Sequence, residues 1–117
     1  MLRGRRSGAV ALRRQQATVF AALGDETRLA LLARLYDGRQ RSIAELTEGS
    51  KLTRQAITKH LRVLERVRVV HSVKAGRESL FEFNPRPIED LKEYLEVVSR
   101  QWDEALLRLK AFVEAEE

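Results

Sequence analysis

Apolar side chains recur every three or four residues over most of this chain, which predicts a mainly helical fold. The clearest case is the stretch from Leu52 to Leu64, where Ile57, Leu61 and Leu64 recur at i, i+4 and i+7. A helix with this spacing rests one face on a core. The remaining positions of this stretch are hydrogen-bonding or cationic, namely Arg54, Gln55, Thr58, Lys59 and Arg62. Side chains of these types can reach the bases and phosphates of DNA, so the stretch is a candidate recognition helix.

Two short helices are expected first along the chain. Residues 15–23 predict one of them, with Val19, Phe20 and Leu23 on one side. Asp25 can cap the next through its side-chain oxygen, and Gly38 suits a left-handed residue just beyond its end near Tyr36. The apolar positions expected to form the core face of this second helix are Leu29, Leu32, Ala33 and Tyr36.

A third short helix is expected to lead directly into the candidate recognition helix. Ser42 and Glu45 fit a capping box, in which each side chain accepts from the backbone N–H of the other residue. Residues 49–51 then leave room only for a tight reversal of direction. Two short helices joined in this way predict a helix-turn-helix.

After Val67 the pattern changes to β-branched residues near alternation. Residues 69–74 and 79–83 predict two strands, and residues 75–78, which include Gly76, predict the turn between them. A β-hairpin directly after a helix-turn-helix is typical of a wing, whose tip would hold Lys74 and Arg77 next to DNA phosphates. The alternative is a solvated hairpin whose charges only protect its edges from pairing.

Residues 86–115 predict a long helix, because Pro87 suits its first turn and apolar residues follow a heptad pattern. At about 1.5 Å per residue such a helix is roughly 40 Å long, more than one small core can cover. A second copy of the chain would cover the rest, which predicts a homodimer through the N- and C-terminal helices. The expected interface residues are Phe20, Leu91, Leu95, Val98, Trp102, Leu109 and Phe112. A monomer whose helix folds back is the alternative, and it would leave Leu106 and Val113 exposed.

Composition narrows the class of protein. The 117 residues suffice for one modest domain, and we expect it to span residues 15–117. No cysteine is present, which excludes disulfides and thiolate metal sites. No apolar run approaches the roughly 20 residues of a membrane span, so no membrane partner is expected and the expected location is the cytoplasm.

Charge is distributed unevenly along the chain. Residues 39–77 contain ten basic and three acidic residues, whereas residues 78–117 contain five basic and eleven acidic ones. A central region with a net charge of +7 predicts a surface that meets a polyanion, although a solvated charged face would look the same. Residues 1–14 contain five arginines and no acid, and we expect a flexible basic arm that either contacts DNA or only adds solubility.

Residues 45–83 resemble the ArsR-type family of winged helix-turn-helix repressors. The run from Leu52 to Leu64 resembles the family's L-S-x-x-x-[VI]-S-x-H-L-x-x-L, with threonines at both serine positions. Gly76 and Arg77 with the following residues resemble the wing's G-R-x-x-x-Y-x-L, and Asp25 to Leu29 resemble the family's D-x-x-R-[LR]. The resemblance implies a DNA-binding repressor, with an arginine, here Arg28, that helps to fix the core.

Two departures from the family pattern affect these expectations. The glycine that usually follows the recognition helix is missing from the segment Arg66 to Val70, so the helix exit is expected to differ. The C-terminal helix has no histidine and the chain has no cysteine, so the resemblance is to a metal-free branch. We therefore expect no metal and no cofactor, and an unidentified small molecule as the effector.

Catalysis is not expected, because no nucleophile has a base near it in sequence and no glycine-rich phosphate loop is present. The two histidines, His60 and His71, fit structural roles better than a metal site. We expect a homodimeric repressor of double-stranded DNA that reads bases through Arg54, Gln55, Thr58 and Lys59. The residues expected on the DNA backbone are Thr53, His60, Arg62, Lys74 and Arg77. The alternatives are a sequence-indifferent DNA-coating protein and a winged-helix module that binds only proteins.

Overall fold

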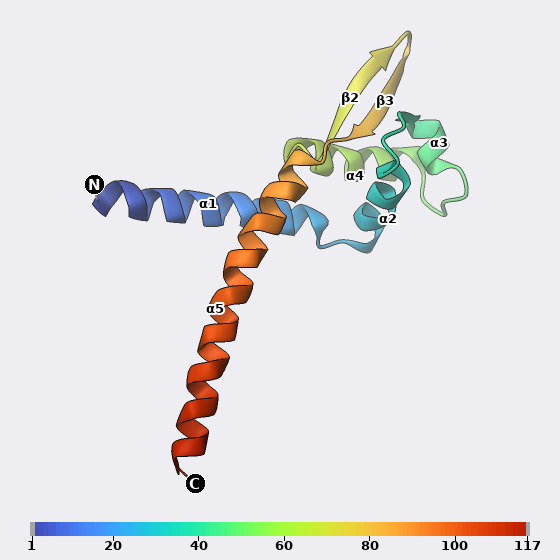
Figure 1. Ribbon diagram of the computed structural model, residues 1–117. Helices are drawn as coiled ribbons and strands as arrows, with labels where there is room; N and C mark the ends of the chain where they lie inside the picture. The colour runs from blue at the N-terminus through green and yellow to red at the C-terminus, as the bar shows by residue number, and fades with distance from the viewer. Residues whose placement is uncertain (1, 117) are drawn as a thin grey trace. The chain divides into compact units, whose positions relative to one another are not determined.

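The computed structural model describes the backbone of residues 2–116 and the side chains of residues 8–115. The elements in chain order are α1 (Leu2–Leu23), α2 (Glu26–Leu35), β1 (Arg41–Ser42), α3 (Ile43–Thr47), α4 (Arg54–Arg66), β2 (Val70–Ala75), β3 (Glu78–Phe83) and α5 (Arg86–Glu116) (Figure 1). The predicted class is confirmed, because a mainly α chain carries a β-hairpin directly after a helix-turn-helix. None of the described helices is long and apolar enough to cross a membrane.

The chain divides into two units, Met1–Pro87 and Ile88–Glu117. The first unit contains the helix-turn-helix, the sheet and a continuous core. The second unit is the remainder of α5, and a lone helix cannot enclose a core of its own.

The core of the first unit is built around α4. Ile57, Leu61 and Leu64 of this helix are at most 1% exposed, as their spacing predicts. The other side chains that are equally buried are Leu32, Leu35, Leu46, Val69, Val70 and Phe81. Removing this apolar surface from water is the main force that holds the helix-turn-helix together.

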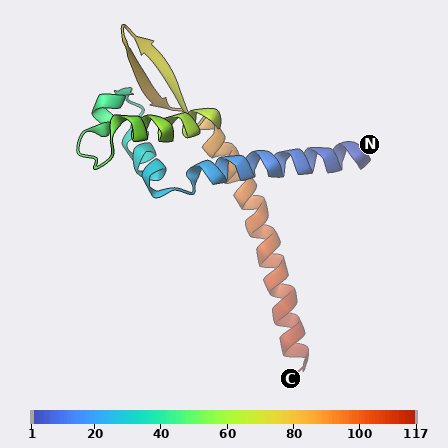
Figure 2. The same cartoon turned by 180° about the vertical axis from the view of Figure 1, so that it is seen from behind.

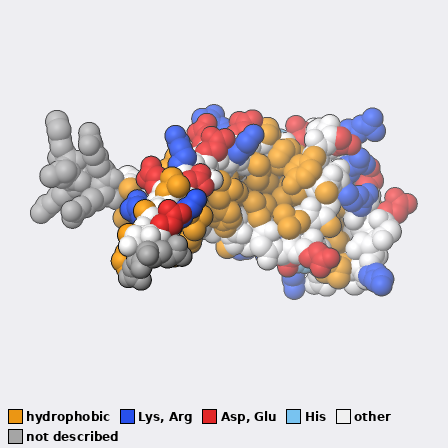
Figure 3. Space-filling view, turned by 60° about the horizontal axis from the view of Figure 1, so that its bottom comes forward, with side chains coloured by type: hydrophobic (Ala, Val, Ile, Leu, Met, Phe, Trp, Pro, Cys, Tyr) orange, Lys and Arg blue, Asp and Glu red, His pale blue; other side chains and the backbone are white. Residues whose placement is uncertain are grey.

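The buried face of α2 differs from the predicted one. Leu31, Leu32 and Leu35 are buried, whereas Leu29, Ala33 and Tyr36 are exposed. The sequence of α2 is apolar on nearly all sides, so spacing alone does not identify the face that meets the core. Figure 3 shows hydrophobic side chains exposed among charged ones on the face that it draws. Tyr36 reaches the ring of Phe83 edge to face, with 5.0 Å between the ring centroids.

Helix α1 begins much earlier than predicted, and its buried face includes Val19 of the predicted face but not Phe20. The structure is helical from Leu2, although residues 1–14 are expected to form a flexible arm. Alanine, leucine and arginine are good helix formers, and they continue the helix towards the N-terminus. The buried residues of α1 are Gln16, Val19 and Ala22, while Phe20 is 40% exposed. The side chains of Arg3, Arg5 and Arg6 lie outside the described part of the chain.

The sheet is antiparallel with the strand order β1-β3-β2. Strands β2 and β3 pair from Val70 with Phe83 to Ala75 with Glu78, which leaves a two-residue turn. Gly76 is the first residue of this turn and has a φ of 66°, as a tight hairpin turn requires. Figures 1 and 2 show the hairpin extending away from α2, α3 and α4. The two-residue strand β1 was not predicted, because its pairing depends on β3 about forty residues later in the chain.

Arg68 shapes the exit from α4. The N–H of Val69 donates to the carbonyl of Leu64 at 3.1 Å, and the N–H of Arg68 donates to the carbonyl of Glu65 at 3.0 Å. This pair of bonds is the Schellman pattern, which places a left-handed residue just after the helix. Arg68 has a φ of 65° and is the one described non-glycine residue with positive φ. The chain thus leaves α4 through a left-handed arginine in place of a glycine, at the cost of backbone strain.

Three arginines close the C-terminal ends of three helices. Arg28 donates to the carbonyls of Ala21 and Ala22 at the end of α1. Arg34 donates to the carbonyls of Glu45 and Leu46 at 3.0 Å each, and Arg41 donates to the carbonyl of Arg34 at 2.9 Å. The last carbonyls of a helix have no partner within the helix, so these bonds satisfy groups that would otherwise need water.

Candidate nucleic-acid interface

The N-terminus of α4 offers a favourable site for a negative charge. Thr53 is the N-cap, and its hydroxyl oxygen accepts from the N–H of Ala56 at 3.1 Å. No acidic residue lies in the first turn, and Arg54 begins it. Because the N-terminal end of a helix dipole is positive, this end of α4 favours a phosphate. The predicted backbone contact of Thr53 is compatible with this position.

A polar stripe runs along the exposed side of α4. Gln55, Lys59, Arg62 and Arg66 are all exposed, and their spacing of four, three and four residues places them on one face. The three buried leucine and isoleucine positions of α4 lie on the other side. The stripe therefore presents one amide and three cations along the length of the helix. Arg66 was missed as a candidate, although the i+4 spacing from Arg62 would have identified it.

Thr58 contributes differently from the other predicted base-reading residues. Its hydroxyl donates to the carbonyl of Arg54 at 2.7 Å, and its side chain is half-buried. The hydroxyl hydrogen is therefore already used within the helix. Thr58 can still offer its methyl group and an oxygen lone pair to a base. The methyl group suits the methyl group of a thymine, and the lone pair can accept a hydrogen bond from a base amino group.

His60 lies against the joint between α1 and α2. Its Nδ1 is 3.3 Å from Nη1 of Arg28 and 3.9 Å from Oδ1 of Asp25. The backbone N–H of Arg28, together with the nearby guanidinium charge of Arg28, holds the pKa of Asp25 below its usual value. The structure thus gives His60 partners within the chain. Arg28 links α1, α2 and α4, in agreement with the core-fixing role that the resemblance implies.

Arg62 also has partners within the chain. Its Nη1 donates to Oε1 of Glu65 at 2.7 Å, and its guanidinium lies over the ring of Phe81, 5.7 Å from the centroid. Oε2 of Glu65 accepts from the hydroxyl of Ser72 on β2, also at 2.7 Å. These contacts, first that of Ser72 and then that of Arg62, hold the pKa of Glu65 below its usual value. The Arg62 side chain remains 47% exposed, so its other N–H groups can still reach a phosphate.

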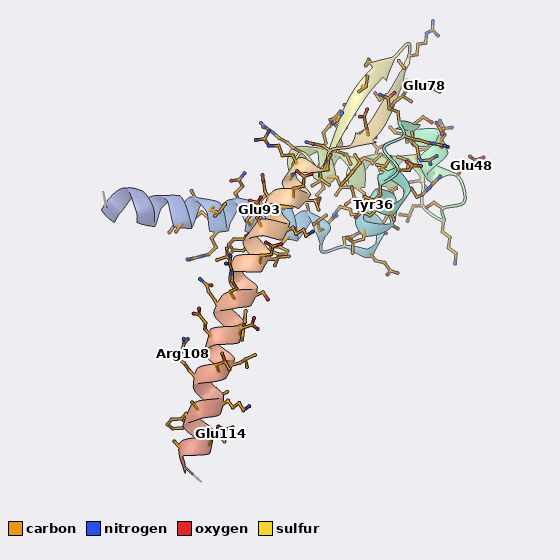
Figure 4. The ribbon with its side chains drawn as sticks, in the orientation of Figure 1. Tyr36, Glu48, Glu78, Glu93, Arg108 and Glu114 are labelled. Atoms are coloured by element: carbon orange, nitrogen blue, oxygen red, sulfur yellow. The ribbon has the colours of Figure 1, made fainter. Side chains whose placement is uncertain are left out.

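The tip of the wing is basic and exposed. Lys74 lies near the end of β2, and Arg77 follows Gly76 in the turn. Both side chains are exposed, and neither forms an ion pair with any described residue. Glu78 begins β3, close to the turn (Figure 4). The two predicted phosphate contacts of the wing are thus available to a partner.

Helix α5 displays most of the residues predicted for a dimer interface. In its second half, Trp102 and Phe112 are each 64% exposed and Leu109 is 58% exposed. Leu95 is 43% exposed, whereas Leu91 is only 5% exposed. Figure 4 shows side chains projecting along the whole helix, with Arg108 and Glu114 labelled in the half nearer the C-terminus. Exposed apolar side chains in such a row are typical of a surface that another chain covers.

Among the described residues, no group of three or more histidine, aspartate or glutamate side chains is placed to hold a metal ion. The two histidines of the chain have different surroundings. His60 is close to Asp25 and Arg28, whereas Nε2 of His71 on β2 is 3.8 Å from Oε2 of Glu82 on the paired strand β3.

Known proteins that resemble this chain share both its sequence and its fold. A helix-turn-helix domain model matches residues 23–73. The uncharacterized HTH-type transcriptional regulator YuzN of Bacillus subtilis is 38% identical over 79 residues, which cover 62% of this chain and 86% of YuzN. An ArsR-like transcriptional regulator from Rhodococcus sp. RHA1 is 36% identical, with a TM-score of 0.73 over 86% of this chain and 93% of that one. The chain belongs to the ArsR family of winged helix-turn-helix transcriptional regulators.

Membership in the ArsR family establishes a DNA-binding transcriptional regulator. The recognition helix of such a regulator corresponds here to α4, and the wing to β2 and β3. More distant ArsR-type structures share only the fold. One of them is the winged helix-turn-helix domain of Mb0332 from Mycobacterium bovis, described as homodimeric, at 23% identity and a TM-score of 0.60 over 81% of this chain and 84% of that one.

Proposed function

We propose that this ArsR-family regulator is a homodimeric repressor that occupies a pseudo-palindromic operator. The observation that carries the proposal is the polar stripe of α4, which adjoins a helix N-terminus free of acidic residues and is followed by a wing with a basic tip. A helix of this kind enters the major groove with its N-terminal residues on base edges. The wing then meets phosphates beside the same groove.

Different side chains perform base reading and backbone contact in this proposal. Arg54 can pair with the two acceptors of a guanine edge, and Gln55 with the donor and acceptor of an adenine edge. Thr58 and Lys59 read neighbouring bases. The backbone contacts are assigned to Thr53, His60, Arg62, Lys74 and Arg77, of which His60 and Arg62 would have to share their intramolecular partners with a phosphate.

A second copy of the chain is the proposed cover for the apolar residues of α5. Trp102, Leu109 and Phe112 are more than half exposed in the single chain, and burying them would remove a large apolar area from water. The homodimeric state described for Mb0332 agrees with this assembly. In a symmetric dimer the two α4 helices would enter successive major grooves about 34–36 Å apart, which requires a pseudo-palindromic site.

Occupation of such a site over a promoter would exclude polymerase, which makes the regulator a repressor. The protein would act in the cytoplasm and without chemistry of its own. A small-molecule effector is proposed as the signal that releases it from DNA. The family's metal signals need cysteine or a ligand cluster, and the described residues show no such cluster.

In vitro selection from random duplexes at physiological salt tests the proposal. A palindromic consensus with half-sites one helical turn apart supports it. Binding with a steep salt dependence but no preferred sequence would instead indicate a DNA-coating protein. The absence of any salt-dependent binding would indicate a winged-helix module that binds proteins. A duplex with only one half-site is the matched control, because a dimer should bind it far more weakly.

A further inference from the structure

The wing is attached to the body by few side chains. Within β2 only Val70 is buried, and the residues from His71 to Ala75 are exposed. Within β3 the buried residue is Phe81. Backbone hydrogen bonds hold β2 to β3, and β1 pairs with β3 only at Leu80 and Phe81, near the base of the hairpin. On the β2 side, the angle at which the hairpin leaves the body depends on side-chain contacts near this base.

Four side chains form a helix–wing joint at this base, namely Arg62, Glu65, Ser72 and Phe81. Glu65 lies in the last turn of α4 and accepts from both Arg62 and Ser72 at 2.7 Å. Ser72 is the register partner of Phe81, so their side chains lie on the same face of the hairpin. Arg62 covers the ring of Phe81. The joint thus connects the recognition helix to both strands of the wing.

Small rotations at the joint become large displacements at the wing tip. Ala75, the last residue before the turn that contains Arg77, lies three residues beyond Ser72, which corresponds to about 10 Å of extended strand. A tilt of roughly 10° at Ser72 would therefore move the end of the strand by about 2 Å, which is enough to break a hydrogen bond. Lys74 is two residues from Ser72, so its side chain lies on the same face of the hairpin as the joint.

We propose that Glu65 is a positioning residue that, through Ser72, sets the angle between the recognition helix and the wing so that both engage one DNA duplex at once. The inference rests on the proposed function, because it assigns the wing tip to DNA phosphates. The two hydrogen bonds of Glu65 in the joint are solvent-exposed, and exposed polar contacts contribute little to the free energy of folding. Its effect is therefore on geometry, and it should appear in DNA binding more than in thermal stability.

Two variants at Ser72 separate geometry from bulk. Ser72→Thr keeps the hydroxyl that donates to Glu65, whereas Ser72→Val replaces it by a methyl group of similar size. Threonine and valine are both β-branched and suit an exposed strand position. Arg77→Ala is made in the wild type and in each variant, and binding to the selected operator duplex is measured over a range of salt concentrations.

The expected result is a strong coupling between Ser72 and Arg77. Arg77→Ala should weaken operator binding roughly tenfold in the wild type and in Ser72→Thr, and lower the salt slope by about one. In Ser72→Val the wing tip is already displaced from the DNA. Arg77→Ala in this background should therefore lower operator affinity by less than about twofold and leave the salt slope unchanged. Ser72→Val alone should lose about as much affinity as Arg77→Ala alone.

An equal cost of Arg77→Ala in all three backgrounds would overturn the inference, since the wing would then be positioned without the joint. That outcome leaves the proposed function intact, because the wild type still binds its operator. If the wild type shows no salt-dependent binding, the proposed function itself fails. Thermal melts of each variant check folding. If Ser72→Val does not fold, Ser72→Ala takes its place, and the wild-type serine is then the control.

Discussion

Replacing Arg68 by glycine should stabilise the protein. Arg68 holds a φ of 65°, and the left-handed conformation costs a residue with a Cβ about 1–2 kcal/mol. Glycine removes this strain but gains conformational entropy in the unfolded chain, which takes back about 0.4–1 kcal/mol. The net gain in the free energy of unfolding is therefore roughly 0.8 kcal/mol, which corresponds to a rise in Tm of about 3 °C for a chain of this length.

Thermal melts followed by circular dichroism measure this effect, at one fixed protein concentration because dimerisation would shift Tm. Arg68→Ala is the matched control, since alanine also loses the charge and the long side chain but keeps the left-handed strain. The carbonyl of Arg68 accepts from the side chain of Asn84 at 2.9 Å, and both variants keep that bond. Alanine should therefore change stability by less than about 0.5 kcal/mol.

A stabilisation by alanine equal to that by glycine would refute the reasoning, because relief of charge repulsion would then explain both. No stabilisation by glycine would show that Arg68 reaches this conformation without strain.

Three further predictions concern DNA binding, assembly and pH. Arg54→Ala should weaken the free energy of binding to the selected operator by roughly 1–3 kcal/mol and relax the base preference at the contacted position. Arg77→Ala should weaken binding to operator and random duplexes alike. If selection with Arg54→Ala returns an unchanged consensus, Arg54 does not read a base. Trp102→Glu should place a charge in the proposed seam of α5 and abolish both the dimer and operator affinity; a variant that still sediments as a dimer would place the seam elsewhere. The pKa of Glu65 is lowered in the folded state, so the ionised carboxylate stabilises the fold. This contribution is fully present at pH values above the usual pKa of 4.5. It is lost as the pH falls through the lower pKa of the folded state. Denaturant unfolding from pH 7 to pH 3 should therefore show the stability difference between the wild type and Glu65→Gln shrinking below about pH 4.5; a constant difference would show that the charge of Glu65 has no stabilising role.

Local patterns predicted the elements that position the site. The capping box of Ser42 and Glu45 forms as predicted, with both hydrogen bonds present, and Thr53 caps α4. Gly76 occupies the turn of the hairpin with positive φ. Each of these signals depends on residues within three or four positions of one another, which is why the sequence alone reveals them.

Features that depend on distant residues were not predictable in the same way. The face that α2 buries is determined by the surfaces of α4 and β3, and the apolar spacing of α2 fits more than one face. The contacts of Arg34 with α3, and of Glu65 with Ser72, join residues of different elements, so no period within one helix or strand predicts them. Left-handed backbone at Arg68 contradicts the preference of its own residue type, so only the surrounding Schellman bonds account for it.

Helix α3 shows what such distant contacts imply for the dynamics of the fold. Its five residues are too few to form a stable helix alone, since isolated helices shorter than about 12 residues are marginal in water. Its first turn is closed by the side chain of Ser42, and its last carbonyls accept from Arg34 on α2. The backbone amides of α3 should therefore exchange with solvent deuterium only when α2 separates from it, in the same cooperative opening as the core. The hydrogen exchange of α3 should therefore report the free energy of global unfolding of the first unit.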